Sequence, residues 1–227
     1  MVAVTVIALI VAFFLLDMGI QYFKKVRMSE VMSHASSRVE EFLSDFLMPL
    51  GVFFHPGHTW ARIQDRGEII VGTDDFVQKS LGTIDRMELP EVGSVVRSNS
   101  PAFKLFQGAK YATFMAPVSG TVIAVNEEVM QNPELMKDQP YESGWIMKIK
   151  PSSAAEDIKS LMIADPAVKW LKKEVCAFRD FLTEIAGQKS ELGLTLADGG
   201  VPISGVLEDF GNPEWSSFQQ NFLNKQA

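Results

Sequence analysis

The pattern that most constrains the fold of this chain lies in its middle part, between Gly51 and Pro151. Short runs rich in Val, Ile and Phe alternate there with Gly, Pro, Asn and Asp, for example Glu68–Val71, Thr121–Val125 and Trp145–Ile149. Short apolar runs bounded by turn residues are typical of a compact domain of short strands. We therefore expect an α+β protein whose central domain, residues 51–152, is built mainly from strands.

A helical period follows this domain. The dipeptide Asp165-Pro166 supplies an N-cap and a first-turn proline, and Gly187 supplies a stop signal. Between them, apolar residues recur every three or four positions: Val168, Leu171, Val175, Phe178, Leu182 and Ile185. This spacing predicts an amphipathic helix from Pro166 to Ala186.

Further along, Asn212-Pro213 predicts the start of a second, short helix with Trp215, Phe218 and Phe222 on one face. Aromatic residues at such spacing are costly to leave in water. We therefore interpret residues 153–227 as a helical carboxy-terminal extension that docks on the central domain.

The amino-terminal stretch Val2–Phe23 predicts a transmembrane anchor over residues 1–24. Val2–Leu16 is an uninterrupted apolar run, and Asp17 and Gln21 are the strongly polar residues that follow it. At about 1.5 Å per residue in a helix, this stretch is long enough to cross a hydrocarbon core of roughly 30 Å.

Basic residues directly after the apolar stretch set the expected orientation. Lys24, Lys25 and Arg27 follow it, while the other flank has no basic side chain, so we expect a single-pass inner-membrane protein with its soluble part in the cytoplasm. The alternative, a cleaved signal peptide, requires a basic start and a small-residue cleavage site, which are not evident. Residues 25–50 carry apolar positions at mixed intervals of three and four, which predicts a juxtamembrane amphipathic helix.

Charge and cysteine content exclude two classes of protein. The chain has 21 basic and 28 acidic residues, a formal net charge of -7, and its basic residues are spread out, so we expect no nucleic-acid partner. Its single cysteine, Cys176, cannot form an internal disulfide, which favours a reducing compartment.

A series of short strings in the middle of the chain carries a family resemblance. In order, they are His58–Ile63, Val71–Phe76, Leu81-Gly82, Glu88–Gly93, Ala116–Gly120, Val125-Asn126, Asn132–Leu135, Pro140-Tyr141 and Gly144-Trp145. In this order and spacing they resemble the glycine cleavage system H protein, although Thr59 replaces a glutamate in that family's His-Glu-Trp triplet. The resemblance implies a lipoyl-type flattened β-barrel or sandwich, also called a barrel-sandwich hybrid, within a multienzyme system.

The lipoyl lysine implied by the resemblance is missing from its position. That lysine precedes the proline of the family's Pro-Val-Ser-Gly turn by eight residues, and the same count back from Pro117 reaches Ala109. Lys110 is the neighbouring residue, and a shift of one position in a hairpin turns a side chain to the other face. The segment Phe106–Gly108 also replaces the family's Glu-Ser-Val. We interpret the chain as a variant that lacks the lipoyl lysine and carries no cofactor.

These features favour a membrane-anchored binding or scaffold module over an enzyme. We expect its protein partner, in a multienzyme or membrane complex, to contact the hairpin from Lys104 to Thr113, through Lys104, Phe106, Lys110 and Tyr111. The alternative is a working carrier with lipoate on Lys110.

A third hypothesis is a metal-dependent redox subunit that uses His55, His58 and Cys176, although their spacing is unfavourable for a metal site. We expect Cys176 to be a buried small hydrophobe instead. The carboxylate pairs Asp74-Asp75 and Glu127-Glu128 are expected to be solvated surface residues.

Overall fold

A computed structural model describes residues 46–188 and 205–227 of the chain. The chain divides into two units, Met1–Ser44 and Asp45–Ala227, and all described residues belong to the second. The predicted anchor over 1–24 lies outside the described residues. The prediction of a juxtamembrane helix over 25–50 is wrong for residues 46–50, which are not helical, and its other residues lie outside the described part. No helix within the described part has the length and apolar character needed to cross a membrane.

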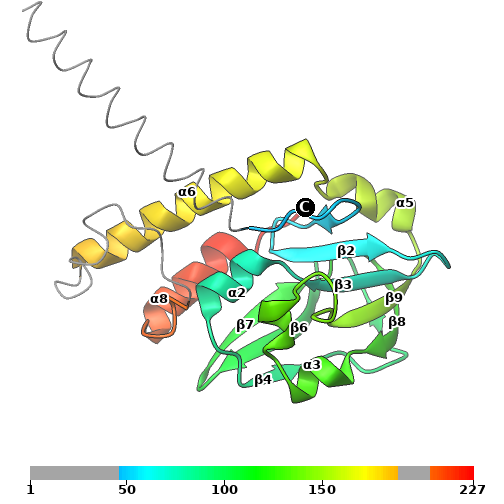
Figure 1. The fold of residues 1–227 in the computed structure, drawn as a ribbon, viewed down its shortest axis with the longest axis horizontal. Coiled ribbons are helices and arrows are strands. Elements are labelled where there is room, and N and C mark those ends of the chain that lie inside the picture. Colours follow the sequence, from blue (N-terminus) through cyan, green and yellow to red (C-terminus); the bar gives the residue numbers. More distant parts are fainter. Residues whose placement is uncertain (1–45, 189–204) are drawn as a thin grey trace, which may run out of the picture. The chain divides into compact units, whose positions relative to one another are not determined.

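Two antiparallel sheets form the central domain (Figure 1). The larger sheet has the order β1-β2-β3-β9-β8-β5. Its strands are β1 (Phe53–Phe54), β2 (Thr59–Ile63), β3 (Ile69–Thr73), β5 (Val95–Val96), β8 (Gly120–Val125) and β9 (Met147–Pro151). The smaller sheet has the order β4-β6-β7, with β4 (Arg86–Glu88), β6 (Pro101–Gln107) and β7 (Lys110–Met115). The prediction of an α+β protein with a sandwich of two small sheets is confirmed.

Alternation along the hairpin β6–β7 shows why these residues form a two-faced sheet. Phe103 pairs with Phe114, and Leu105 pairs with Ala112, and all four side chains are buried. The rings of Phe103 and Phe114 stack at a centroid distance of 5.1 Å. Because side chains alternate between faces along a strand, the intervening residues point to the outer face of this sheet.

Trp60 is a close-fitting core residue of the larger sheet. It is fully buried and lies opposite Gly72 in the β2–β3 ladder. Its indole Nε1 donates a hydrogen bond of 3.0 Å to the carbonyl of Thr73. A Cβ atom added to Gly72 would lie only 2.7 Å from the indole ring, so this position requires glycine for the close approach of the ring.

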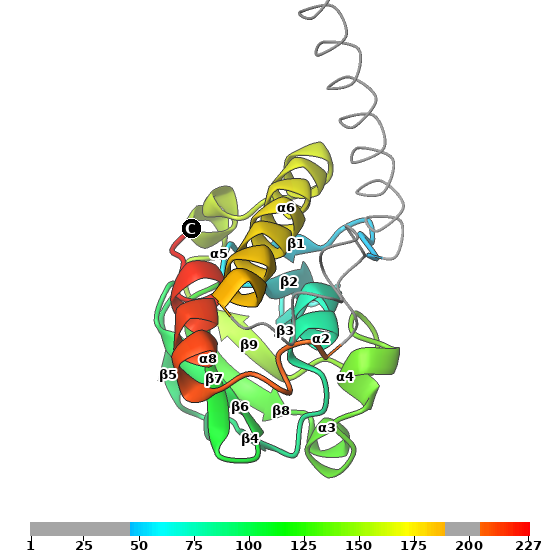
Figure 2. The ribbon, with the colours of Figure 1, turned by 90° about the vertical axis from the view of Figure 1, so that its left-hand side faces the viewer.

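Short helices connect the strands, and one long helix crosses over the larger sheet. The short ones are α2 (Asp75–Leu81), α3 (Glu127–Gln131), α4 (Leu135–Asp138), α5 (Ala154–Asp157) and the 3-10 helix η1 (Ile158–Ser160). The long helix α6 spans Asp165–Gln188 and lies on the side of β1 and β2, away from β4 (Figures 1 and 2).

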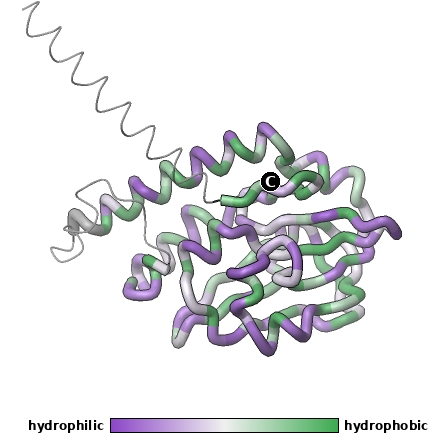
Figure 3. Tube along the Cα trace, viewed as in Figure 1, coloured by the Kyte–Doolittle hydropathy of each residue, from purple (hydrophilic) through white to green (hydrophobic). Residues whose placement is uncertain are grey.

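The amphipathic pattern of α6 is largely as predicted, with two corrections. Leu171, Val175 and Phe178 are buried, and hydrophobic and hydrophilic residues alternate along the helix (Figure 3). Val168, which we expected on the buried stripe, is 47% exposed, because it lies a quarter-turn from the inner face. The helix also continues through Gly187, since a glycine is tolerated in a helix that tertiary contacts hold.

The carboxy-terminal segment, residues 205–227, docks on the domain as predicted. It contains α8 (Asn212–Phe218) and a π-helical turn, η2 (Gln219–Leu223). Trp215, Phe218 and Phe222 are all buried. The rings of Phe218 and Phe222 lie 5.8 and 5.6 Å from the ring of Phe178 on α6. The segment therefore shares a core with α6.

Replacing Gly72 by alanine should destabilise the domain, because the new methyl group would overlap the Trp60 ring. Overpacking of this kind typically costs about 1–3 kcal/mol of unfolding free energy. Urea unfolding should show a lower midpoint with an unchanged slope. As a control, Val95→Ala at a position 72% exposed should change stability by less than about 0.5 kcal/mol. Equal midpoints for the two variants would contradict the role given to Gly72.

Candidate functional site at the hairpin tip

The tip of the β6–β7 hairpin is a two-residue turn formed by Gly108 and Ala109. Gln107 and Lys110 are the last paired residues on either side of it. Gly108 has a positive φ of 56°, and glycine at this first turn position is the mark of a type II′ turn. Ala109 is exposed at the apex, whereas Lys110 is the first residue of β7.

The Lys110 side chain does not extend freely from the tip. Its ammonium donates hydrogen bonds to three backbone carbonyls of the carboxy-terminal segment, those of Leu207 (3.1 Å), Glu208 (2.7 Å) and Phe210 (3.2 Å). The same nitrogen lies 4.8 Å from the ring centroid of Trp215, within cation–π range. These contacts use all three ammonium hydrogens.

Burial lowers the pKa of Lys110, and the nearby carboxylates of Asp209 and Glu208 offset this only in part. Glu208 also accepts a hydrogen bond from the backbone N–H of Thr83, on the other side of the tip. The segment is thus fastened to the tip by side chains from both partners.

The same segment also covers the outer edge of β7. Trp215 Nε1 donates to the carbonyl of Tyr111 (2.6 Å), and Gln219 Oε1 accepts from the N–H of Thr113 (3.1 Å). Further along the edge, the Thr59 hydroxyl donates to the carbonyl of Met115 (3.0 Å). Side chains therefore occupy backbone groups that an edge strand would otherwise offer to another strand.

The other three residues predicted to bind a partner lie on the outer face of the smaller sheet. Phe106 and Tyr111 pair across the hairpin, with ring centroids 5.7 Å apart. The Lys104 ammonium lies 5.7 Å from the Tyr111 ring and 3.3 Å from a Glu88 oxygen. Arg86 stacks over Phe106 at 3.6 Å, a contribution that our sequence analysis missed. Lys110 belongs to the opposite face, so the structure separates it from this cluster.

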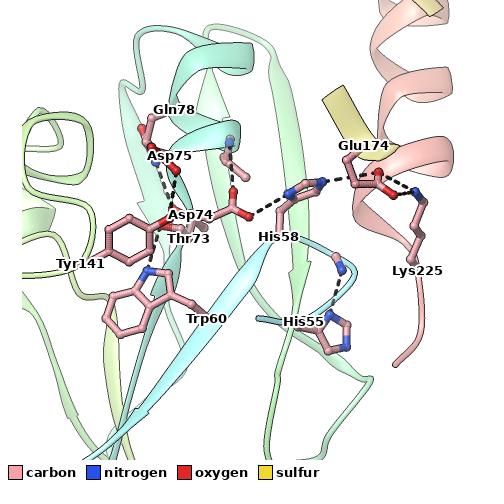
Figure 4. A network of polar contacts seen from close by, with 12 residues as sticks. His55, His58, Trp60, Thr73, Asp74, Asp75, Gln78, Tyr141, Glu174 and Lys225 are labelled. Atoms are coloured by element: carbon pink, nitrogen blue, oxygen red, sulfur yellow. Dashed lines mark hydrogen bonds and ion pairs between the residues drawn. The ribbon is translucent and has the colours of Figure 1, made fainter. Parts of the chain in front are cut away.

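A second group of polar residues surrounds His58, which is fully buried just before β2 (Figure 4). His58 Nδ1 lies 2.8 Å from Asp74 Oδ2, and Nε2 lies 3.8 Å from Glu174 Oε2 on α6. The Lys225 ammonium is 2.6 Å from the same Glu174 oxygen. The four side chains form a chain of alternating charge that joins the strand domain, α6 and the carboxy-terminal segment.

The pKa of His58 follows from this geometry. Burial alone would lower it, but the carboxylates of Asp74 and Glu174 outweigh burial and raise it. Burial would likewise raise the pKa of Glu174, but His58 and Lys225 lower it. The imidazolium and the Glu174 carboxylate therefore stabilise each other in their charged forms.

Our expectation that Asp74 and Asp75 are surface residues is wrong. Both are buried, Asp74 as the N-cap of α2 and partner of His58. Asp75 accepts hydrogen bonds from the Leu47 N–H (2.7 Å) and the Tyr141 hydroxyl (2.9 Å), and burial raises its pKa to about 6. The second pair, Glu127 and Glu128, is exposed as predicted.

The residues proposed for a metal site have other partners. The Gly57 N–H donates to His55 Nδ1 (2.9 Å), so Nε2 carries the proton and donates to Asn99 Oδ1 (2.9 Å). Cys176 is half-buried rather than fully buried as expected. No group of three His, Cys, Asp or Glu side chains that could hold a metal ion occurs within 46–188 and 205–227.

The two antiparallel sheets, with the β6–β7 hairpin in the smaller one, define a small β-sandwich domain. The family model described as glycine cleavage H-protein matches residues 52–174, which is more than half of the 227 residues. The chain belongs to the glycine cleavage H-protein family. Members of this family carry a group between enzymes, and the chain is not itself an enzyme.

Relatives match a stretch of similar length. A probable glycine cleavage system H protein of Thermococcus gammatolerans is 38% identical over 130 residues, which are 57% of this chain and 96% of the relative. The H protein of Listeria monocytogenes is 36% identical over 124 residues, 55% of this chain and 98% of the relative. A crystal structure of the H protein from Mycobacterium marinum covers 56% of this chain and 98% of its own at 22% identity, with a TM-score of 0.49. The segment that captures Lys110 lies beyond the residues that the family model matches.

Glu174→Gln should destabilise the protein and change its dependence on pH. Breaking a buried ion pair costs about 3–5 kcal/mol, so the loss at pH 6 should be of this order. Because the pKa of His58 is raised, its stabilising contribution is complete below its unfolded pKa of about 6.5 and is lost as the pH rises through the folded pKa. As the pH is raised through the folded pKa of His58, the unfolding free energy of the variant should therefore fall less than that of the wild type.

Chemical denaturation at several pH values from about 6 upward checks this expectation, since unfolded histidine titrates near about 6.5 and the pKa of His58 is raised above that in the folded protein. Asp75 titrates in both proteins, so its contribution cancels in the difference between them. The exposed Glu184 on the same helix supplies a matched control, and Glu184→Gln should have little effect. Parallel pH curves for wild type and Glu174→Gln would contradict the assignment of the pH dependence to His58.

Proposed function

We propose that the chain is a membrane-anchored, non-lipoylated H-protein-like module that binds and positions a protein partner of a multienzyme or membrane complex. The main support for this proposal is the structure of the hairpin tip. The residue at the apex is Ala109, and the ammonium of Lys110 donates hydrogen bonds to three carbonyls. A lipoyl arm requires an accessible amine at the apex of the hairpin.

The chemistry of acylation argues against Lys110 as a substitute. Attachment of lipoate requires a neutral, accessible amine and gives an amide with a single N–H, so at least two of the three hydrogen bonds of Lys110 would be lost. The displaced carbonyls of Leu207 and Phe210 would then lack their partner in a partly buried environment. The residues present at this tip therefore do not fit the cofactor that the family implies.

Family membership and the lowered pKa of Lys110 favour a second candidate, the working carrier with lipoate on that residue. A lowered pKa increases the fraction of neutral amine, which is the reactive form. The two candidates differ in a single covalent group, so they can be separated directly.

The outer face of the smaller sheet is the surface that we assign to the partner. Phe106 is half-buried and Tyr111 is 47% exposed, and the cations of Arg86 and Lys104 lie over these rings. Aromatic and arginine side chains are the residue types that contribute most to binding at protein interfaces. H proteins interact with enzymes of the glycine cleavage system, and the partner proposed here belongs to a complex of that kind.

The anchor is proposed from the sequence alone. The apolar stretch Val2–Phe23 is long enough to cross a bilayer, and the basic residues Lys24, Lys25 and Arg27 favour a cytoplasmic position for the domain. On this proposal the protein is a single-pass inner-membrane protein whose binding module faces the cytoplasm.

Intact mass spectrometry of the full-length chain, purified from its native membranes, tests the absence of lipoate. We expect the mass of the unmodified sequence, because no accessible amine occupies the apex. A lipoylated H protein from the same cells serves as the positive control. A lipoyl-sized addition on a peptide that contains Lys110 would overturn the proposal and establish the carrier.

Placing a lysine at the apex should restore modification. Ala109 is exposed and has no positive φ, so Ala109→Lys introduces an amine there without backbone strain. When a lipoate ligase is produced alongside, we expect this variant to gain a lipoyl-sized mass and Lys110→Arg to gain none. If Ala109→Lys stays unmodified while a true H protein is modified, the missing apex amine is not the obstacle.

A further inference from the structure

The first half of α6 has a basic outer face. Lys169, Lys172 and Lys173 are all exposed there, and Val168 beside them is 47% exposed. The opposite face of the same turns is buried through Ala167 and Leu171, which hold the helix on the domain. Lysines at spacings of three and four residues lie on one side of a helix, so these side chains form one continuous surface.

This surface is unusual for the chain as a whole, whose formal net charge is -7. Between Val168 and Lys173 the helix carries no acidic residue, and the next one, Glu174, is buried and paired with Lys225. Ile163, just before the helix, is a further apolar residue with 37% of its surface exposed. Exposed apolar side chains next to lysines are typical of helices that bind at a membrane surface.

The amino-terminal part of the chain joins the domain close to α6. Phe46, the first described residue, packs its ring 6.3 Å from that of Phe76, and Phe76 contacts Phe178 of α6 at 5.2 Å. Met48 packs against the core cluster that includes Ala167 in the first turn of α6. Figure 2 shows β1, the edge strand of the larger sheet, next to α6.

We propose that the outer face of the first half of α6 binds the anionic headgroups of the membrane in which the chain is anchored. This inference rests on the anchoring proposed above. Only 23 positions separate Phe23 from Phe46. Even a fully extended chain of that length reaches only about 80 Å. A face tethered so closely meets the headgroups at a high effective concentration, which makes weak electrostatic binding sufficient.

The geometry gives this docking a consequence for the partner. Strand β4 of the smaller sheet lies on the opposite side of the domain from α6 in both views (Figures 1 and 2). With α6 against the headgroups, the outer face that carries Phe106 and Tyr111 is directed away from the lipid. The domain is then presented to a partner in a fixed orientation rather than free to turn on its tether.

The test uses the full-length chain in lipid nanodiscs made either from phosphatidylcholine alone or from phosphatidylcholine with phosphatidylserine. Brief labelling with an amine-reactive reagent, followed by peptide mass spectrometry, gives a modification rate for each lysine. We expect the rates of Lys169 and Lys173 to fall at least threefold in the anionic discs. The exposed Lys137 on α4 should react equally in both discs. High salt should abolish the difference, because surface charges are then screened.

Charge-reversal variants make the test specific. In Lys169→Glu/Lys173→Glu, we expect anionic discs no longer to protect Lys172, whereas the control Lys137→Glu should keep that protection. Equal rates in the two discs for an incorporated wild-type chain would overturn the docking of α6 and leave the anchor intact. A chain that stays outside the discs altogether would overturn the anchor and, with it, this inference.

Discussion

The contacts of one buried histidine join the three parts of this domain. His58 has a φ of 61°, in the left-handed region that is uncommon for residues other than glycine, and this conformation turns its ring into the core, where it stacks on Phe76 at 4.1 Å. On one side it pairs with Asp74 at the start of α2, and on the other it faces Glu174 on α6. Without the imidazolium, these two buried carboxylates would lose the positive charge that lies between them. The ion pairs that link α6 to the strand domain therefore depend on the protonation of His58, in addition to the apolar contacts of the helix.

The same network continues from Glu174 on α6 to Lys225 in the carboxy-terminal segment. Apolar packing also holds this segment on the domain. Lys225 pairs with Glu174, while six large apolar side chains of the segment are at most 3% exposed: Leu207, Phe210, Trp215, Phe218, Phe222 and Leu223. Burial of each such side chain contributes about 1.5–3 kcal/mol. A segment fixed in this way is part of the fold rather than a displaceable cover. Its contacts with Lys110 and with the edge of β7 are accordingly constant features of the tip.

The strand domain and the hairpin could be predicted from local pattern. Alternation of buried residues and a glycine in the turn specify the register of β6 and β7. The place of Ala109 at the apex was instead predicted from the family resemblance, by counting back from Pro117. The alternation and the glycine act between residues a few positions apart, where physical preferences of single residues decide the conformation. The docking of Trp215 and Phe218 was predictable for a similar reason, since their helical spacing creates an apolar face.

The hydrogen bonds and ion pairs of the charged side chains could not be predicted, because the two partners of each contact are distant in the sequence. Asp75 bonds Tyr141, which is 66 positions away, and the Lys110 ammonium bonds carbonyls 97 to 100 positions away. In a sequence, a buried carboxylate is indistinguishable from a solvated one until its partner is known. Every residue has a backbone carbonyl, so the sequence does not mark the carbonyls that bind Lys110. The same limit explains why Val168 was assigned to the buried stripe: periodicity places the stripe on the helix, but only contacts show how wide it is.

On the scaffold hypothesis, the missing apex lysine and the carboxy-terminal segment have a common cause. A lipoyl arm must move around the apex, and in this chain one flank of the apex is filled by the residues that bind Lys110. If no lipoyl arm has to move, a segment packed beside the apex does not impair function. The segment also covers β7, an edge strand that could otherwise pair with other chains. Conversely, with the segment in place, Lys110 donates hydrogen bonds to the carbonyls of the segment instead of extending into solvent. The scaffold hypothesis thus accounts for both departures from the family with a single cause, whereas the carrier hypothesis must treat the segment as an obstacle to its own cofactor.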